Sequence, residues 1–384
     1  MNAPDVLVVG AGITGAAAAF ALAEAGHRVE IIDAHGPAAM ASGWTLAGVR
    51  QSGRHPAELP LARAAVALWP DLAERLGAPT GYLRGGNLRL ARTEAEVATV
   101  RALVADQRAA GLELSWLDPG DLRDLAPNLS HAILGASFCA TDGHADPNAT
   151  VAAYLGAARR LDARTGWGER LIALETGGGR ITAAVTDGRR IVPGAVVLAT
   201  GIEVNAHLGP LGAMIPLRRP IVTLVQTAPV ALRFPFVIGV ANADFALRQE
   251  ASGRLRFTSG AEDFAGEVEH DGARPVVRPT LTSVAATLGR AAALLPGAAR
   301  APLNAVWGGL LDLTPDALPV IDMHPACANL VLAAGFSGHG FGIGPVTGAL
   351  AADLVMGRTP AHPLHPFSFG RFAGAPNAEL SLPG

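Results

Sequence analysis

The sequence has 384 residues, of which 50% are hydrophobic and 16% are charged. This composition predicts a globular protein, long enough for two domains with sizeable cores, and excludes a disordered chain. The formal net charge of −3 gives no reason to expect nucleic acid or an anionic membrane as a partner. Cys139 and Cys327 lie far apart and make neither a metal-ligand spacing nor a disulfide framework, so no metal site is predicted.

The N-terminus lacks a basic segment followed by an apolar core, and a strand pattern begins almost at once. We therefore expect no signal peptide. No uncharged apolar run reaches transmembrane length. A cytoplasmic location is the simplest expectation.

Residues 6–33 have the pattern of a nucleotide-binding βαβ unit. An apolar strand (residues 6–9, VLVV) leads into residues 10–15 (GAGITG), a small-residue helix follows to Ala25, and a second strand (residues 29–32) ends on Asp33. A strand before the glycines, a helix after them and an acid at this distance make the motif a specific one.

Each residue of the motif has a physical purpose. Gly10 permits the tight exit from the strand, Gly12 lets a pyrophosphate approach the backbone, and Gly15 lets the helix pack against the sheet. The helix N-terminus offers N–H groups and partial positive charge to the phosphates. Asp33 is placed to accept hydrogen bonds from ribose hydroxyls. A bound dinucleotide follows from these features.

The next segment, residues 41–50, is too polar and glycine-rich for a core strand. Ser42, Gly43 and Thr45 are suited to bind phosphate oxygens at a second helix start, although an ordinary loop explains the same composition.

The middle of the chain alternates helix and strand patterns. Helices are predicted at residues 59–76, 93–111 (with a capping box from Thr93 to Glu96), 148–160 and 280–295, with a short helix after Asp118. Strand patterns lie at residues 85–90 and in a hairpin around 187–188. Residues 138–147 read as a crossing between domains, and residues 215–257 as a mixed or antiparallel sheet.

Two later segments point again to a nucleotide. Residues 194–201 form an apolar strand ending in a small-residue turn, which is how a buried parallel strand delivers backbone to a ligand. Near the C-terminus a strand (residues 329–334) leads into a loop with five glycines (residues 335–344), and Pro345 is predicted to open a helix to Met356. Glycine loops near both ends of the chain suit a long cofactor held at both ends.

Residues 10–15, 199–201 and 335–344 together resemble the D-amino-acid oxidase superfamily of FAD amine oxidoreductases. Within it the chain is similar to glycine oxidase, sarcosine oxidase and, nearest, the β subunits of heteromeric opine, proline and hydroxyproline dehydrogenases. The resemblance covers nearly the whole chain. Its most specific part is residues 335–341 (GFSGHGF), preceded by residues 312–316 (DLTPD) and 318–322 (LPVID).

The resemblance implies an α/β fold, with a Rossmann-like FAD-binding domain and a discontinuous substrate domain on a mixed or antiparallel sheet. Residues 1–82, 144–215 and 318–372 would form the FAD domain, and residues 83–143 and 216–317 the substrate domain. The implied FAD-binding residues are Gly10, Gly12, Ile13, Thr14, Gly15, Asp33, Ala34, Ser42, Gly43, Thr45, Leu46, Leu171, Ala199, Thr200, Gly201, Gly309, Gly338, His339, Gly340, Phe341, Gly342 and Ile343.

The implied chemistry is oxidation of a C–N bond to an imine by hydride transfer to flavin N5. The implied substrate is an amino acid or a carboxylated secondary amine: an opine, a D-amino acid, an imino acid or a sarcosine-like compound. Since a carboxylate is best held by a fixed guanidinium, Arg50, Arg54 and Arg256 are candidates, with solvated surface arginines as the alternative. His339 is the fourth candidate, with a structural histidine as the alternative.

Three departures from the family bear on the mechanism. Gly309 stands where monomeric sarcosine oxidase has its FAD-linking cysteine, so FAD is expected to be non-covalent. Gly342 and Arg256 stand where that enzyme has a lysine near flavin N1 and an oxygen-activating lysine. These differences favour a dehydrogenase over an oxidase.

The resemblance also implies partner subunits, an iron–sulfur cluster at their interface and FMN as a second flavin. Alternatives are a stand-alone FAD oxidase that uses O2, a flavin electron-transfer subunit and an NAD-linked dehydrogenase.

Overall fold

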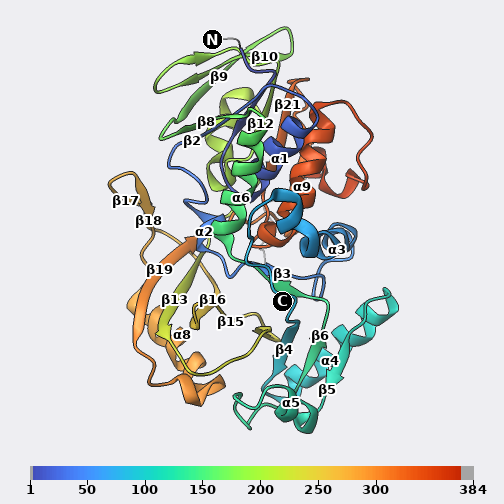
Figure 1. The fold of residues 1–384 in the computed structure, drawn as a ribbon, viewed down its shortest axis with the longest axis vertical. Coiled ribbons are helices and arrows are strands. Elements are labelled where there is room, and N and C mark those ends of the chain that lie inside the picture. Colours follow the sequence, from blue (N-terminus) through green and yellow to red (C-terminus); the bar gives the residue numbers. More distant parts are fainter. Residues whose placement is uncertain (1–2, 373–384) are drawn as a thin grey trace.

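The computed structural model describes residues 3–372, and the first half of its fold is built on a six-stranded sheet (Figure 1). The strand order is β20-β21-β12-β1-β2-β8, and every neighbouring pair is parallel except β20 with β21. The strands are β1 (Val6–Val9), β2 (Val29–Asp33), β8 (Arg164–Trp167), β12 (Ala195–Leu198), β20 (Val320–Met323) and β21 (Leu330–Ala334).

Both faces of this sheet are buried, as its continuous apolar strands require. Val6 and Val8 belong to a core shared with helices, and Leu7 and Val9 belong to the core on the other face. The helices of the first face are α1 (Ile13–Glu24), α3 (Leu59–Leu76), α6 (Pro147–Arg160) and α9 (Gly340–Val355). The second face is covered by α7 (Val204–Leu208) and a small sheet of β9 (Leu171–Gly177), β10 (Arg180–Thr186) and β11 (Arg190–Ile191).

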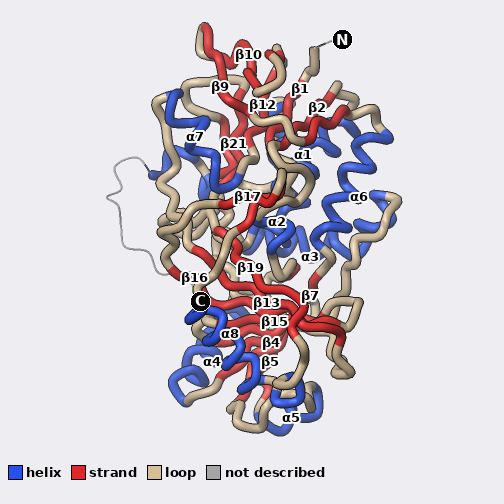
Figure 2. Tube along the Cα trace, turned by 90° about the vertical axis from the view of Figure 1, so that its left-hand side faces the viewer, coloured by secondary structure: helices blue, strands red, loops and turns tan. Residues whose placement is uncertain are grey.

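The second half is built on an eight-stranded sheet at the opposite end of the molecule (Figure 2). Its order is β19-β13-β16-β15-β14-β4-β6-β5, with β14 and β4 parallel and the remaining neighbours antiparallel. The strands are β4 (Asn87–Ala91), β5 (Ser115–Leu117), β6 (Gly135–Cys139), β13 (Ile221–Pro229), β14 (Val237–Val240), β15 (Phe245–Gln249), β16 (Arg254–Glu262) and β19 (Leu303–Leu310).

The eight-stranded sheet turns one face away from the six-stranded half. Helices α5 (Pro119–Leu125) and α8 (Leu281–Leu294) share an apolar core with that face, which includes Leu88, Leu247 and Phe257. Helix α4 (Glu94–Ala109) flanks β4 and β6. Short elements join the two halves: α2 (Ala41–Trp44), β3 (Gly48–Val49), β7 (Gly143–His144) and the hairpin β17 (Glu269–Asp271) with β18 (Arg274–Val276).

The predicted fold class is confirmed, with a mostly parallel sheet in one half and a mixed sheet in the other. The strands of the six-stranded sheet fall within the three segments assigned to the FAD domain, and those of the eight-stranded sheet fall within the other two. The domain boundaries themselves remain a prediction, and residues 1–2 lie outside the described part of the chain.

The predicted start of the last helix is wrong. Helix α9 begins at Gly340, so Pro345 lies inside it rather than at its first position. Tertiary packing imposes the earlier start: a Cβ on Gly342 would lie 2.7 Å from the carbonyl oxygen of Gly48, and one on Gly344 would lie 2.6 Å from Ile13 Cγ1. The proline removes one intrahelical N–H, and this loss is tolerated because the helix is held by its neighbours.

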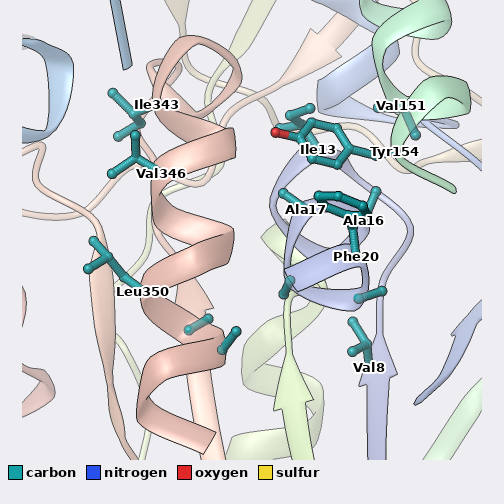
Figure 3. Close-up of a cluster of buried hydrophobic side chains, with 14 of the residues drawn as sticks. Val8, Ile13, Ala16, Ala17, Phe20, Val151, Tyr154, Ile343, Val346 and Leu350 are labelled. Carbon is teal, nitrogen blue, oxygen red and sulfur yellow. The ribbon is translucent and has the colours of Figure 1, made fainter. Parts of the chain in front are cut away.

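Helices α1 and α9 pack unusually close together. Figure 3 shows Ile13, Ala16, Ala17 and Phe20 on α1, beside α9. A Cβ on Gly348 would lie 2.5 Å from the Ala17 Cβ and 2.7 Å from the backbone nitrogen of Ala18. Since Gly344 and Gly348 lie four residues apart, they form one smooth face of α9. This contact carries the two glycine-rich loops to the same edge of the sheet.

Substitution of Gly348 by alanine should destabilise the protein. The added methyl group meets backbone and Cβ atoms that cannot move aside, so we expect a loss of about 1–3 kcal/mol. The matched control is Gly289→Ala on α8, where nothing lies within 4 Å of the added Cβ. The control should gain about 0.5–1 kcal/mol from helix propensity. Thermal unfolding of both variants checks this, and equal melting temperatures would contradict the packing argument.

Candidate active site

The three predicted nucleotide-binding segments meet at the carboxyl edge of the six-stranded sheet. Strands β1, β12 and β21 are neighbours in that sheet, and each of them ends in one of the segments (residues 10–15, 199–201 and 335–344). The contact is close, because a Cβ on Gly10 would lie 2.3 Å from the Ala199 carbonyl oxygen. Gly10 also has a φ of +107°, which favours glycine. Loops from both ends of the chain therefore line one site.

Two adjoining cavities occupy this edge and the space below it. The larger has a volume of about 340 Å³ and extends to the eight-stranded sheet, and the smaller has a volume of about 130 Å³ and extends toward β9. The residues that line both cavities are Gly12, Ala41, Ser42, Ala199, Gly201, Leu310 and Asp312. The two cavities thus lie side by side along the same residues, and a long ligand suits this arrangement better than a compact one.

Most of the predicted cofactor residues line these cavities. In the larger cavity they are Gly12, Ile13, Thr14, Gly15, Ser42, Thr45, Leu46, Ala199, Gly201, Gly309, Gly338, His339, Gly340 and Phe341. In the smaller cavity they are Gly10, Gly12, Asp33, Ala34, Ser42, Leu171, Ala199, Thr200 and Gly201. Gly43, Gly342 and Ile343 line neither cavity and support the wall instead: Gly43 packs on Ala38, Gly342 on β3, and Ile343 lies in the core.

The start of α1 fits a pyrophosphate. Gly12 is the N-cap residue and offers no side chain, and Ser42 Oγ accepts a hydrogen bond from the Ile13 backbone nitrogen at 3.0 Å. Behind the turn, the Asp33 carboxylate accepts from the backbone nitrogens of Ala11 (2.7 Å) and His35 (2.8 Å), which fixes the loop. Backbone N–H groups, helix dipole and a carboxylate at the ribose position match the needs of an FAD nucleotide.

The smaller cavity has polar walls at its far end. Leu171 begins β9 there, next to Arg170, whose Nη1 donates to Glu203 at 3.2 Å, and His207 also lines this cavity. The β17–β18 hairpin reaches over from the other half of the molecule: the His270 ring lies 5.4 Å from the ring of His35, which also lines this cavity. This end suits an adenosine group.

Three arginines gather on one wall of the larger cavity. Arg50 and Arg54 follow β3, and Arg89 comes from β4. Arg50 Nη1 and Arg89 Nη2 converge on Gly53, where a Cβ would lie 3.0 Å and 2.6 Å from them. Arg54 is buried, with its Nε donating to the Arg50 carbonyl oxygen at 3.3 Å. Arg50, whose Nη1 donates to the Ser52 carbonyl oxygen at 2.8 Å, and Arg54 are thus held by the backbone of their own loop.

Two buried carboxylates lie behind the arginines. Asp142 accepts hydrogen bonds from the backbone nitrogen of Gln51 at 2.8 Å and from the backbone and side chain of Ser52. Glu58 lies 3.9 Å from Arg54 Nη1 and 3.4 Å from His339 Nδ1. Three guanidinium groups against two carboxylates leave one formal positive charge. Burial lowers the pKa of Arg50 well below its ordinary value, and Arg54 and Arg89 lower it further.

Arg256 lies elsewhere. Its Nε donates to Glu250 at 2.8 Å, its Nη1 donates to the Thr45 carbonyl oxygen at 2.9 Å, and its guanidinium lies over the Trp307 ring. Neither Arg256 nor Trp307 lines the larger cavity. We therefore leave Arg256 out of the proposed substrate site.

Sequence reasoning missed Arg89, Glu58 and Asp142. The signal for Arg89 is alternation within β4, because Leu88 and Leu90 face the core and Asn87 and Arg89 take the opposite face. Glu58 stands four residues after Arg54, a spacing that matches an ion pair at a helix start. No local signal marks Asp142, because its hydrogen bonds go to Gln51 and Ser52, which lie far away in the sequence.

The fold and this cavity fit an oxidoreductase of the dinucleotide-binding class, and strands of the eight-stranded sheet form the far wall of the larger cavity. Residues 5–354 match the family model described as FAD dependent oxidoreductase, and the chain belongs to this family. The family resemblance predicted from the glycine loops is thereby confirmed, and the family is dependent on FAD, as expected, rather than on NAD.

Several similar proteins match this chain over 91% or more of their own length. Glycine oxidase from Geobacillus kaustophilus is 30% identical over 388 residues, which cover 98% of this chain and 99% of that protein. The crystal structure of glycine oxidase from Geobacillus kaustophilus has a TM-score of 0.89 at 28% identity, covering 97% of this chain and 99% of that one. Sarcosine oxidase subunit beta from Arthrobacter sp is 25% identical and covers 96% of this chain and 91% of that protein.

Within residues 3–372, no helix has the length and apolar character needed to cross a membrane. The same residues hold no cluster of three histidine, cysteine or acidic side chains that could bind a metal ion.

Replacement of Gly12 by valine should abolish retention of FAD. Gly12 lines both cavities, and a branched side chain there occupies the space where the backbone must meet a pyrophosphate. The measurement is the flavin-to-protein absorbance ratio after gel filtration. Gly289→Ala, far from either cavity, should keep the wild-type ratio. A yellow, stoichiometric Gly12→Val protein would show that the cofactor does not lie on this turn.

Proposed function

We propose that this protein oxidises the C–N bond of an amino acid or carboxylated secondary amine to an imine, with FAD as the hydride acceptor. The observation that carries the proposal is the arginine wall beside the flavin-binding loops. The larger cavity joins Gly338–Phe341 on one side to Arg50, Arg54 and Arg89 on the other. A carboxylated amine matches both sides of the cavity, with its carboxylate at the arginines and its amine at the flavin-binding loop.

The charge balance favours one carboxylate on the substrate. The wall has one formal positive charge left over, and a single bound carboxylate neutralises it. Burial lowers the pKa of Arg89 to about 10, and Arg54 adds to this shift. A bound carboxylate should raise the pKa of Arg89 again, because an opposite charge within a few ångströms favours the charged guanidinium. Arginine pairs with a carboxylate through two parallel hydrogen bonds, which fix its orientation.

The remaining wall holds the reacting carbon in a dry environment. Val222, Leu224, Val237, Phe245 and Leu310 contribute apolar atoms to the larger cavity. Exclusion of water strengthens the arginine contacts and holds the amine in one orientation. Bound FAD supplies the hydride acceptor, while the chain supplies alignment and charge. The N-terminus of α9 directs backbone N–H groups toward the region where negative charge develops on reduction.

We propose FAD as non-covalent, because the position of the linking cysteine is Gly309 and neither cavity is lined by cysteine. Cys139 and Cys327 are free and buried.

A dehydrogenase that passes electrons to a partner is our preferred form of this activity. Gly342 and Arg256 replace the two lysines that the family resemblance associates with flavin N1 and oxygen, and Arg256 is held by Glu250. The relative from Arthrobacter is named as a subunit, which supports a heteromer. An iron–sulfur cluster at the interface with a partner subunit, and FMN, stay predictions from the family resemblance. A stand-alone oxidase that uses O2 is the second candidate, favoured by the glycine oxidase relative. The cytoplasmic location also remains a prediction.

Anaerobic addition of substrate should bleach the visible flavin absorbance of the purified protein. The panel should contain sarcosine, proline, D-amino acids and opines, each with its decarboxylated analogue, since the arginine wall demands a carboxylate. Turnover is then followed with a dye acceptor and, separately, with O2. We expect dye reduction to be faster. If the carboxylated members all fail to bleach the flavin, the substrate class is wrong.

Conservative replacement of the wall arginines should weaken substrate binding. Lysine keeps the charge but loses the paired hydrogen bonds, so Arg50→Lys and Arg89→Lys should each raise the dissociation constant about tenfold or more. The matched control is Arg256→Lys, which preserves the pair with Glu250 and should leave binding within about twofold. Anaerobic titration measures all three. If only Arg256→Lys raises the dissociation constant, the carboxylate site lies at Arg256 and the proposed arginine wall is wrong.

A further inference from the structure

Glu58 and His339 form a buried acid–base pair at the edge of the larger cavity. The Glu58 side chain is 1% exposed, and His339 lines the cavity with a side chain that is 17% exposed. Their closest approach, 3.4 Å, joins Glu58 Oε2 to His339 Nδ1. Among the described residues, neither carboxylate oxygen of Glu58 has a hydrogen-bond partner. A buried carboxylate in this condition is costly, so its position calls for a reason.

The positions of both residues follow from the helices that they precede. Glu58 is the N-cap residue of α3, and His339 is the N-cap residue of α9. The two helices pack together, and Trp69 of α3 donates a hydrogen bond to the Gly342 carbonyl oxygen of α9 at 2.8 Å. The pair therefore connects the core of the FAD half directly to the cavity wall.

A structural ion pair between Glu58 and Arg54 does not account for this arrangement. Their separation of 3.9 Å is too long for a hydrogen bond, although both side chains are buried. One oxygen of the Glu58 carboxylate lies nearer to the imidazole, 3.4 Å from His339 Nδ1, although the two atoms are not hydrogen-bonded. Because Nδ1 is turned toward Glu58, His339 presents Nε2 to the cavity that it lines.

The charged groups around the pair keep the imidazole neutral. Burial lowers the pKa of His339 to about 4, and Arg54 and Arg50 lower it as well, while Glu58 acts in the opposite direction. Burial raises the pKa of Glu58, but Arg54, His339 and Arg50 outweigh it and bring that pKa to about 2. At neutral pH the pair is therefore a carboxylate beside a neutral imidazole. The imidazole can accept a proton at Nε2.

We propose that His339 is the catalytic base that deprotonates the bound substrate ammonium, and that Glu58 is its positioning residue. This inference rests on the proposed function. In the step, one N–H bond of the ammonium breaks and the proton goes to His339 Nε2, which leaves a neutral amine with its lone pair for oxidation. Glu58 orients Nδ1–H and stabilises the imidazolium that forms. The substrate carboxylate, by neutralising the arginine wall, raises the basicity of His339 at the moment when it is needed.

The test compares anaerobic flavin reduction in the wild type and the His339→Gln holoenzyme across pH 4 to pH 10, a range that includes the acidic limb set by His339, with the best substrate of the panel. The wild type should show a limiting rate constant that changes little above neutrality. His339→Gln should be slower by about 100-fold at neutral pH, the usual contribution of a general base. Its rate should also rise about tenfold per pH unit, because the substrate amine must then lose its proton to water.

Two further variants separate this role from a structural one. Glu58→Gln should lower the rate by less than His339→Gln and shift the acidic limb of the profile to lower pH, since loss of the carboxylate makes His339 a weaker base. His324→Asn is the matched control: His324 is buried, lines neither cavity, and accepts a hydrogen bond from the Ala326 nitrogen that asparagine can reproduce. Its pH profile should equal that of the wild type.

The outcomes distinguish the two proposals. If no carboxylated amine reduces the wild-type flavin, the proposed function fails. If the wild type is reduced and flavin-loaded His339→Gln keeps both its rate and its flat profile, the proposed function stands and the base assignment is wrong. If His339→Gln does not retain flavin, His339→Asn and Glu58→Gln are compared with the wild type in the same way. A pH profile of flavin reduction equal to that of the wild type, in either variant, overturns the assignment.

Discussion

The close contact between α1 and α9 is the constraint on which the site depends. Gly344 and Gly348 leave no side-chain atoms at two neighbouring positions of α9, so the backbones of two helices from opposite ends of the chain can approach. Buried helices of this kind gain their stability from packing rather than from intrinsic propensity. The same contact sets the distance between the turn at residues 10–15 and the loop at residues 335–344. A cofactor that spans both loops therefore depends on a packing detail deep in the core.

Local patterns predicted the elements well where the pattern was strong. The periodicity of residues 59–76 gives α3 with the same bounds, and Thr93 accepts from the Glu96 nitrogen as an N-cap should. The start of α9 was mistaken because Pro345 is a strong local signal and tertiary packing of Gly342 and Gly344 overrides it. The glycine segments were found because each depends on a backbone requirement visible in a few consecutive residues.

The substrate wall was only partly predictable. Arg50 and Arg54 follow a recognisable turn, but Arg89 reaches the cavity only because β4 pairs with β14 and β6 in the eight-stranded sheet. Arg256 has the same residue type and an equally plausible sequence position, yet Glu250 engages it. Arg89 and Arg256 differ because the pairing of the strands gives them different neighbours. A single sequence does not specify how strands far apart in the chain pair with one another.

The proposed substrate gives a physical reason for the three arginines in the wall of the larger cavity. Charged groups withdrawn from water cost free energy unless they are paired, and this wall is one carboxylate short of balance. In the proposed function this shortage contributes to affinity, because the proposed substrate supplies the missing negative charge. The same proposal links binding to chemistry: Arg54 lies 3.9 Å from Glu58, Glu58 lies 3.4 Å from His339, and a carboxylate that neutralises the arginines would raise the basicity of the imidazole. Under this proposal, recognition of the substrate carboxylate prepares the amine of the same molecule for oxidation.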